Sequence, residues 1–134
     1  MNPPRLLARL LVLVTLLLAT SIVSPAPTAR AAWNGQQIYI SSAEGGVTAT
    51  SLQIVGPNQN GSVVTYGAYF GYPGPSNYWV GGWWWKGKVQ VTIGLAIANP
   101  GLSKTVTCYG DVPSIQSGSD WVRVSFNRYG CWKS

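Results

Sequence analysis

The stretch Val89–Ala98, VQVTIGLAIA, decides the fold class because its apolar side chains alternate with polar or small ones. Successive side chains of a β-strand point to opposite faces, so one face of this segment is wholly aliphatic. The members of that face are Val89, Val91, Ile93, Leu95 and Ile97. A two-residue period of this kind indicates a strand with one side in a core and argues against an amphipathic helix.

The same alternation recurs on both sides of this stretch. The expected strands are residues 36–41, 47–55, 62–72, 78–85, 89–98, 105–109 and 120–126. Asn60-Gly61, which with Ser62 also forms an N-glycosylation sequon, is a strong hairpin signal, and Asn99-Pro100-Gly101 is a turn sequence. About seven short strands with frequent turns predict an all-β protein, a small antiparallel β-sandwich or a partly closed barrel.

The N-terminal residues have the features of a secretory signal peptide. Arg5 and Arg9 form a positive region, Leu10–Ala19 is an apolar segment, and Ala29-Arg30-Ala31 is a cleavage motif. The apolar segment is about half the ~20 residues that a membrane-spanning helix needs, which disfavours an anchor. We therefore expect a signal peptide over residues 1–31, one domain over residues 32–134, and a secreted, extracellular protein.

Cys108 and Cys131 are the two cysteines of the chain. An even number of cysteines in an exported protein favours a disulfide bond between them. The bond would close a loop with 22 residues between its ends. On the chain-entropy model such a loop contributes about 3 kcal/mol to stability. We expect the bond to hold the last segment beside the strand at residues 105–109.

The composition excludes several kinds of catalytic and metal site. The chain has no histidine and only three acidic residues, Glu44, Asp111 and Asp120. A Ser-His-Asp triad, a Cys-His pair and a His-ligated metal or haem are therefore excluded. Asp111 and Asp120 are the one conceivable carboxylate pair of a glycosidase, but aspartates that flank a loop are ordinary turn residues. We expect a protein that is not an enzyme and that has no cofactor or bound metal.

The charge balance argues against nucleic acid as a partner. Nine basic residues against three acidic ones give a net charge of +6, and loss of residues 1–31 would reduce it to +3. A small cationic protein of this kind lacks the dense basic stripe of a nucleic-acid binder. Its charge suits loose attraction to an anionic surface.

The aromatic content is the distinctive feature of the chain, with seven Trp, seven Tyr and two Phe residues. Four of the tryptophans lie in Tyr78–Trp85, YWVGGWWW. Large aromatic side chains usually fill cores, and Gly81-Gly82 suggests a bulge or an edge. A half-buried strand, however, hides only one alternate set of side chains. The other set is then exposed.

We expect Tyr78–Trp85 to form a hairpin with Val89–Ala98 across a two-residue turn at Lys86-Gly87. This register places Trp84 opposite Val89 and in the core. The outer row then consists of Trp79, Trp83 and Trp85, with successive alternate residues about 6.6 Å apart. A shift of one residue in the turn exchanges the two faces.

Exposed, flat and rigid aromatic rings on a surface of low charge suit carbohydrate, whose C–H faces stack on indole rings. In composition the chain resembles small secreted β-sandwich carbohydrate-binding modules, and no shared motif transfers a binding residue. We predict a secreted, non-catalytic binding domain for carbohydrate or cell-wall glycan. The candidate ligand-binding residues are Trp79, Trp83, Trp85, Tyr69 and Tyr72.

Two other functions fit the sequence. A cationic, Trp-rich membrane-active or antimicrobial-type protein would insert a hairpin tip at Trp83–Lys88 into an anionic membrane surface. A secreted inhibitor or protein-binding module would use the loop Gly71–Asn77. Salt distinguishes the first function from glycan binding, because it screens charge attraction and does not screen stacking.

Overall fold

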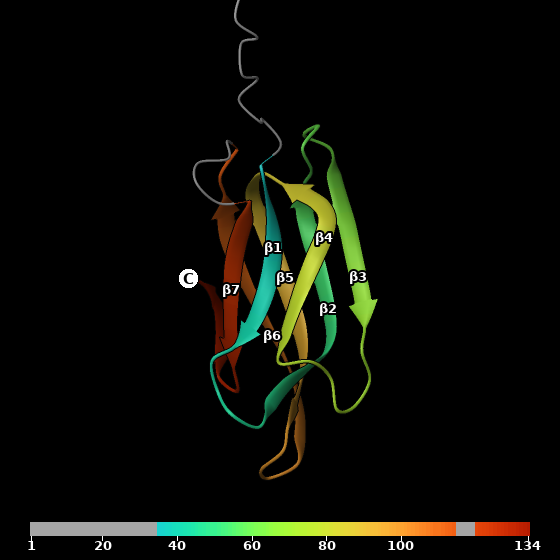
Figure 1. The fold of residues 1–134 in the computed structure, drawn as a ribbon, viewed down its shortest axis with the longest axis vertical. Helices are drawn as coiled ribbons and strands as arrows, with labels where there is room; N and C mark the ends of the chain where they lie inside the picture. Colours follow the sequence, from blue (N-terminus) through green and yellow to red (C-terminus); the bar gives the residue numbers. More distant parts are fainter. Residues whose placement is uncertain (1–34, 115–119) are drawn as a thin grey trace, which may run out of the picture.

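The computed structural model describes residues 35–114 and 120–134, so the expected signal peptide lies outside the described residues. The described chain forms two stacked four-stranded sheets (Figure 1). Its strands are β1 (Gln36–Ser42), β2 (Val47–Pro57), β3 (Val63–Tyr69), β4 (Asn77–Trp85), β5 (Gly87–Ile97), β6 (Leu102–Val112), β7 (Trp121–Asn127) and β8 (Gly130–Lys133). The predicted β-sandwich is confirmed, and the two sheets are not closed into a barrel. No described segment forms a helix long and apolar enough to cross a membrane.

One sheet has the strand order β4-β1-β7-β8 and the other has the order β3-β2-β5-β6. Neighbouring strands are antiparallel except β1 and β7, which run parallel. β3 and β4 are therefore edge strands of different sheets, and Figure 1 shows them along one side of the sandwich. β6 and β8 are the other two edge strands.

The core lies between the sheets and follows from the alternation that the sequence shows in β5. All five aliphatic side chains of that face are buried. The residues that cover them from the other sheet include Ile38, Ile40, Val122, Val124 and Phe126. Burial of each such side chain contributes roughly 1.5–3 kcal/mol, so this double layer supplies much of the stability of the fold.

Two predicted turns are confirmed as β-hairpins. Between β2 and β3, Asn58 Oδ1 accepts hydrogen bonds from the backbone N–H groups of Asn60 and Ser62. Gly61 in this turn and Gly101 in the β5–β6 turn have φ angles of +83° and +84°. Residues that have a Cβ atom disfavour these angles, so glycine at these positions favours both turns.

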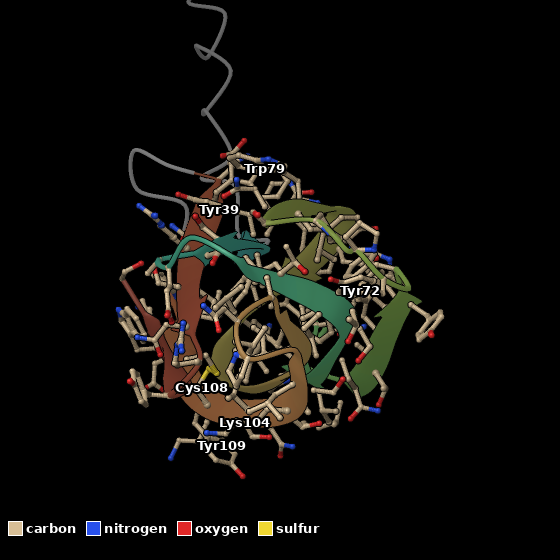
Figure 2. The ribbon with its side chains drawn as sticks, turned by 90° about the horizontal axis from the view of Figure 1, so that it is seen from below. Tyr39, Tyr72, Trp79, Lys104, Cys108 and Tyr109 are labelled. Carbon is tan, nitrogen blue, oxygen red and sulfur yellow. A yellow bond between two sulfur atoms is a disulfide. The ribbon has the colours of Figure 1, made fainter. Side chains whose placement is uncertain are left out.

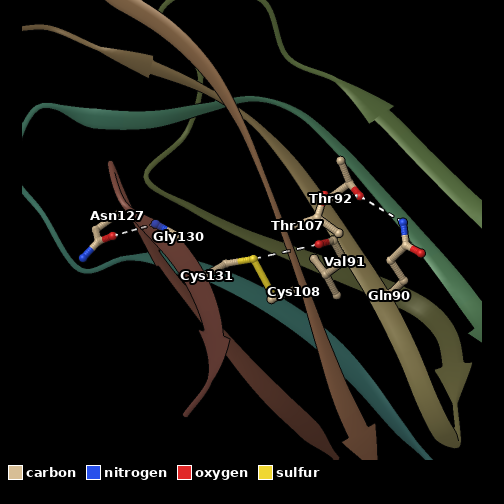
Figure 3. The surroundings of a disulfide bond; sticks show 8 residues. All are labelled: Gln90, Val91, Thr92, Thr107, Cys108, Asn127, Gly130 and Cys131. Atoms are coloured by element: carbon tan, nitrogen blue, oxygen red, sulfur yellow. Dashed lines mark hydrogen bonds between the residues drawn. A yellow bond between two sulfur atoms is a disulfide. The ribbon is translucent and has the colours of Figure 1, made fainter.

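The disulfide between Cys108 and Cys131 is confirmed, with a Cα–Cα distance of 5.5 Å (Figure 3). Cys108 lies on β6, and Cys131 lies on the short strand β8, which the sequence analysis did not predict. The chain end is held beside β6, as expected, but its backbone pairs with β7. The bond therefore connects the edge strands of the two sheets.

The expected hairpin between β4 and β5 is wrong. β4 pairs with β1, whereas β5 pairs with β2 and β6 in the opposite sheet. Only Lys86 separates the two strands, so no two-residue turn forms and the chain passes from one sheet to the other. Lys86 N donates a hydrogen bond to Pro57 O at 3.0 Å, which fixes this corner to the end of β2.

A bulge also changes which side chains of β4 point into the core. Val80 pairs with Ile38 and Trp85 pairs with Gln36, so β4 advances five positions while β1 advances two. Gly82, with φ +78°, lies within the irregular stretch and permits it. Val80 and Trp85 are consequently both buried despite their odd spacing. Trp84, expected in the core, is only half-buried.

The acidic residues have separate surroundings. Glu44 accepts a hydrogen bond from Arg128 N at 3.1 Å and forms an ion pair with its guanidinium group. Asp111 lies within β6, opposite Lys88, and not in a turn. Asp120 directly precedes β7, and residues 115–119 lie outside the description. Within the described ranges, no group of three His, Cys, Asp or Glu side chains has a metal-binding arrangement.

Candidate functional site

The five residues expected to bind ligand do not form one row. Trp79 is 53% exposed on β4, and Trp83, which follows the bulge on the same strand, is 40% exposed. Tyr69 ends β3, and Tyr72 lies in the loop after it; both are exposed. Trp85 is fully buried in the core, so its predicted place on the outer face is wrong. The physical cause is the bulge at Gly81-Gly82, which reverses the alternation after Val80.

Three aromatic rings from three neighbouring strands gather on the outer face of the β4-β1-β7-β8 sheet. We call Tyr39, Trp79 and Trp121 the outer aromatic cluster. Tyr39 stacks on Trp79 with ring centroids 4.1 Å apart, and Trp121 meets Trp79 edge-on at 4.9 Å. Tyr39 is the cross-strand partner of Trp79, which brings the rings together, and Figure 2 shows the two side by side.

Arg123 adds a cationic group to this face. It is the β7 partner of Tyr39, and its Nη2 donates a hydrogen bond to Ser41 Oγ at 3.1 Å. The guanidinium group is thereby directed to Ser41, two residues along β1 from Tyr39. The outer aromatic cluster thus presents Trp79 as its most exposed ring, on a face that also carries Arg123.

A second aromatic feature is a cleft of about 240 Å³ between the β2–β3 turn and the bulge of β4. Its lining consists of Asn58, Gln59, Gly82, Trp83 and Trp84. We call it the Trp83–Trp84 cleft. The walls are held together by the backbone, because Gln59 N donates a hydrogen bond to Trp84 O at 3.1 Å. The two hydrogen bonds that Asn58 Oδ1 accepts also fix the orientation of that amide.

The indole of Trp83 is supported from behind by other rings. Tyr66 of β3 meets it edge-on with centroids 5.4 Å apart, and the buried Trp85 stacks near it at 6.0 Å. The hydroxyl of Tyr66 is hydrogen-bonded to that of Tyr78 at 2.9 Å. Burial, followed by this hydrogen bond, raises the pKa of Tyr66 to about 12, so its hydroxyl stays neutral. Trp83 is therefore preorganised by contacts that carry no charge.

Gly81 and Gly82 connect the two aromatic features along β4. At both positions, no heavy atom lies within 4 Å of the place that a Cβ atom would occupy. Gly82 N also donates a hydrogen bond to Gln37 Oε1 at 2.5 Å, which fixes the bulge to β1. The strand between Trp79 and Trp83 thus leaves open space beside its backbone.

The Trp83–Trp84 cleft has the chemistry of a binding site for an uncharged ring. The residues that line it are two tryptophans, an asparagine, a glutamine and a glycine, and none of them is ionisable. Ligand pockets are typically concave and aromatic, with a few placed polar groups that orient the ligand. These amides and rings can donate, accept and stack.

The sequence did not predict Tyr39, Trp84 and Trp121 as surface rings, or Asn58 and Gln59 as polar partners. Tyr39 had a readable signal, because it alternates with buried isoleucines and must point outward. The others depend on which strands become neighbours. The cleft combines residues that are more than 20 positions apart in the chain.

The sequence of this chain matches no protein-family model and no curated protein, and its fold matches no solved structure.

Proposed function

We propose that this protein is a secreted, non-catalytic domain that binds an uncharged polysaccharide along β4. The observation that carries the proposal is the Trp83–Trp84 cleft, where the exposed indole of Trp83 lies beside the β2–β3 turn residues Asn58 and Gln59. A chain in this site extends over Gly81-Gly82 toward the outer aromatic cluster around Trp79. β4 thereby contributes residues to both parts of the site.

Sugar rings match these groups in two ways. The C–H face of a pyranose packs on an indole, and its hydroxyl groups exchange hydrogen bonds with side-chain amides. Trp79 and Trp83 are four residues apart, which is at most about 13 Å along a strand. This span suits an oligosaccharide segment better than a single sugar.

The proposal that the protein is secreted draws on the signal peptide expected over residues 1–31 and on the disulfide. A disulfide that connects two sheets is maintained most readily in an oxidising compartment. A glycan of a cell wall or extracellular matrix would be accessible to a protein exported in this way.

The membrane-active alternative has less support. It required a hairpin tip at Trp83–Lys88, and β4 and β5 belong to different sheets. The inhibitor alternative uses the loop after β3, where Tyr72 is exposed and lies apart from Tyr39 and Trp79 in Figure 2. No other feature of that loop specifies a protein partner.

Sedimentation with insoluble cellulose, chitin or peptidoglycan tests the proposal. We expect the protein to be retained on at least one of them in about 1 M salt, where the Debye length is ~3 Å and charge attraction is screened. Trp79→Ala and Trp83→Ala should each weaken retention about tenfold, or ~1.4 kcal/mol. Tyr129→Ala removes an even more exposed ring from the β7–β8 turn and should leave retention unchanged.

Two results would contradict the proposal. One is binding to anionic lipid vesicles that falls as salt rises, together with no retention on any glycan. The other is equal retention of Trp83→Ala and the unaltered protein. The thermal unfolding midpoint of each variant, measured in parallel, separates a lost contact from a lost fold.

A further inference from the structure

The outer face of the β3-β2-β5-β6 sheet carries a second, separate hollow. It is a shallow groove of about 520 Å³ that crosses β3, β2 and β5. The side chains on its outer surface are those of Ser51, Gln53, Tyr69 and Thr92, with Gly67 between them. We call it the hydroxyl groove. It lies on the sheet opposite to the one that contains β4.

The strand register explains why this hollow exists. Gly67, Gln53, Thr92 and Thr107 are successive cross-strand partners and form one row across four strands. At about 4.8 Å per strand, this row is ~14 Å long. Gly67 has no side chain, and no heavy atom lies within 4 Å of the place a Cβ atom would take there. The groove is therefore deepest where it crosses β3 at Gly67, because no side chain fills it there.

Two side-chain hydrogen bonds orient the hydroxyl group of Thr92, which lies in this row. Gln90 Nε2 donates a hydrogen bond to Thr92 Oγ1 at 3.4 Å, and the hydroxyls of Thr92 and Thr107 lie 3.1 Å apart (Figure 3). Tyr69, at the β3 end, is 84% exposed. The groove thus combines the hydroxyl groups of Ser51 and Thr92 and the amide of Gln53 with one freely accessible aromatic ring, and hydrogen bonds orient the hydroxyl of Thr92.

We infer that the hydroxyl groove is a second binding site for an uncharged polysaccharide chain, so that one molecule bridges two chains. No Lys, Arg, Asp or Glu residue lines the groove, which disfavours nucleic acid, anionic lipid and acidic peptide as occupants. A ligand rich in hydroxyl groups exchanges hydrogen bonds with amides and hydroxyls and stacks one ring on Tyr69. This inference takes its class of ligand, an uncharged polysaccharide, from the proposed function and takes nothing else from it.

Bridging follows from the position of the two sites. β4 and the hydroxyl groove belong to opposite sheets of the sandwich, and packed sheets lie about 10 Å apart. A single straight chain that lies along β4 cannot also lie across the outer face of the opposite sheet. Two occupied sites therefore engage two chains or two segments of a folded chain, which raises the avidity for a dense polysaccharide surface.

Gly67→Val is the sharpest probe of this site. The position has open space for the side chain, its φ is not in the left-handed region, and β-branched residues favour strands. The variant should fold normally and fill the groove. Gly45→Val, in the β1–β2 loop, also has open space and no positive φ, and it serves as the matched control. Tyr69→Ala tests the same groove by removing its ring.

Two measurements separate the two sites. The first is affinity electrophoresis in gels that contain hydroxyethyl cellulose, xyloglucan or dextran, and the second is aggregation of fine cellulose or chitin particles. We expect the unaltered protein and Gly45→Val to be retarded and to aggregate particles. Gly67→Val and Tyr69→Ala should still bind particles through β4 but should no longer aggregate them. Their retardation in the gels should be about threefold smaller than that of the unaltered protein.

Each outcome decides one of the two sites. If Gly67→Val and Tyr69→Ala retard and aggregate as the unaltered protein does, the second site is refuted while glycan binding by β4 stands. If Trp83→Ala binds normally and Gly67→Val does not bind at all, the β4 site is refuted and the hydroxyl groove stands. If the unaltered protein neither binds nor aggregates any of these polysaccharides, both proposals are overturned.

Discussion

Trp85→Ala is expected to lower the free energy of unfolding by about 3–5 kcal/mol, the usual cost of truncating a buried tryptophan. Trp85 is the largest fully buried side chain and stacks near Trp83 at the end of β4. Its removal leaves a cavity at the corner where the chain passes from one sheet to the other. Chemical unfolding followed by circular dichroism measures the loss directly.

Two variants make this prediction specific. Trp84→Ala truncates a half-buried ring and should cost only about 1–2 kcal/mol. Trp85→Phe keeps an aromatic ring in the core and removes an indole N–H that has no hydrogen-bond acceptor among the described residues, so it should cost much less than Trp85→Ala. Equal losses for Trp84→Ala and Trp85→Ala would show that the faces of β4 have been assigned incorrectly.

Removal of the disulfide is expected to have the second largest effect. The double variant Cys108→Ser/Cys131→Ser opens a loop with a sequence separation of 23, which on the chain-entropy model costs about 3 kcal/mol. The double substitution leaves no single thiol to form mixed disulfides. The thermal unfolding midpoint of the oxidised protein, of its reduced form and of the double variant gives the measurement.

The effect should begin at β8. This strand has only four residues, and besides its pairing with β7 it is held by a hydrogen bond from Lys133 Nζ to Asp111 O at 2.7 Å. Hydrogen exchange of the β8 amides should accelerate before that of β5 in the double variant. An unchanged unfolding midpoint would mean that the contacts of β6 and β8 hold the sheets together without the bond.

The sequence was sufficient to predict the sandwich because the side-chain pattern of β5 shows which of its faces is buried. Five aliphatic residues at alternate positions specify a strand with one buried face, and the turn residues at Asn60-Gly61 and Asn99-Pro100-Gly101 delimit its neighbours. The pairing of Cys108 with Cys131 followed from there being only two cysteines. These features are local, so they do not depend on which strands meet.

The partner of β4 was not predictable from local pattern. A strand followed closely by another strand normally forms a hairpin with it, and here the link of one residue, Lys86, forces the chain across to the other sheet. The parallel pairing of β1 with β7 joins segments about 80 residues apart. The bulge at Gly81-Gly82 then determines which tryptophans are buried, and its size is set by the contacts with β1.

The candidate site was predictable in part. The exposure of Trp79, Trp83, Tyr69 and Tyr72 agrees with the structure, since each is a large ring on a strand or loop with few covering segments. Their separation into different surfaces depends on sheet order. The Trp83–Trp84 cleft also needs the β2–β3 turn, which reaches it only through the three-dimensional fold.

The central claim is that an uncharged polysaccharide lies along β4 between Trp79 and Trp83. Gly81→Val tests it most directly, because the valine side chain fills the open space on this path without a positive φ or a steric clash. Gly45→Val is the control at a distant position of the same kind. The measurement is the dissociation constant for the insoluble polysaccharide that retains the unaltered protein in about 1 M salt. We predict equal affinity for the unaltered protein and Gly45→Val and an affinity about tenfold lower for Gly81→Val, whereas unchanged affinity of Gly81→Val would contradict the account.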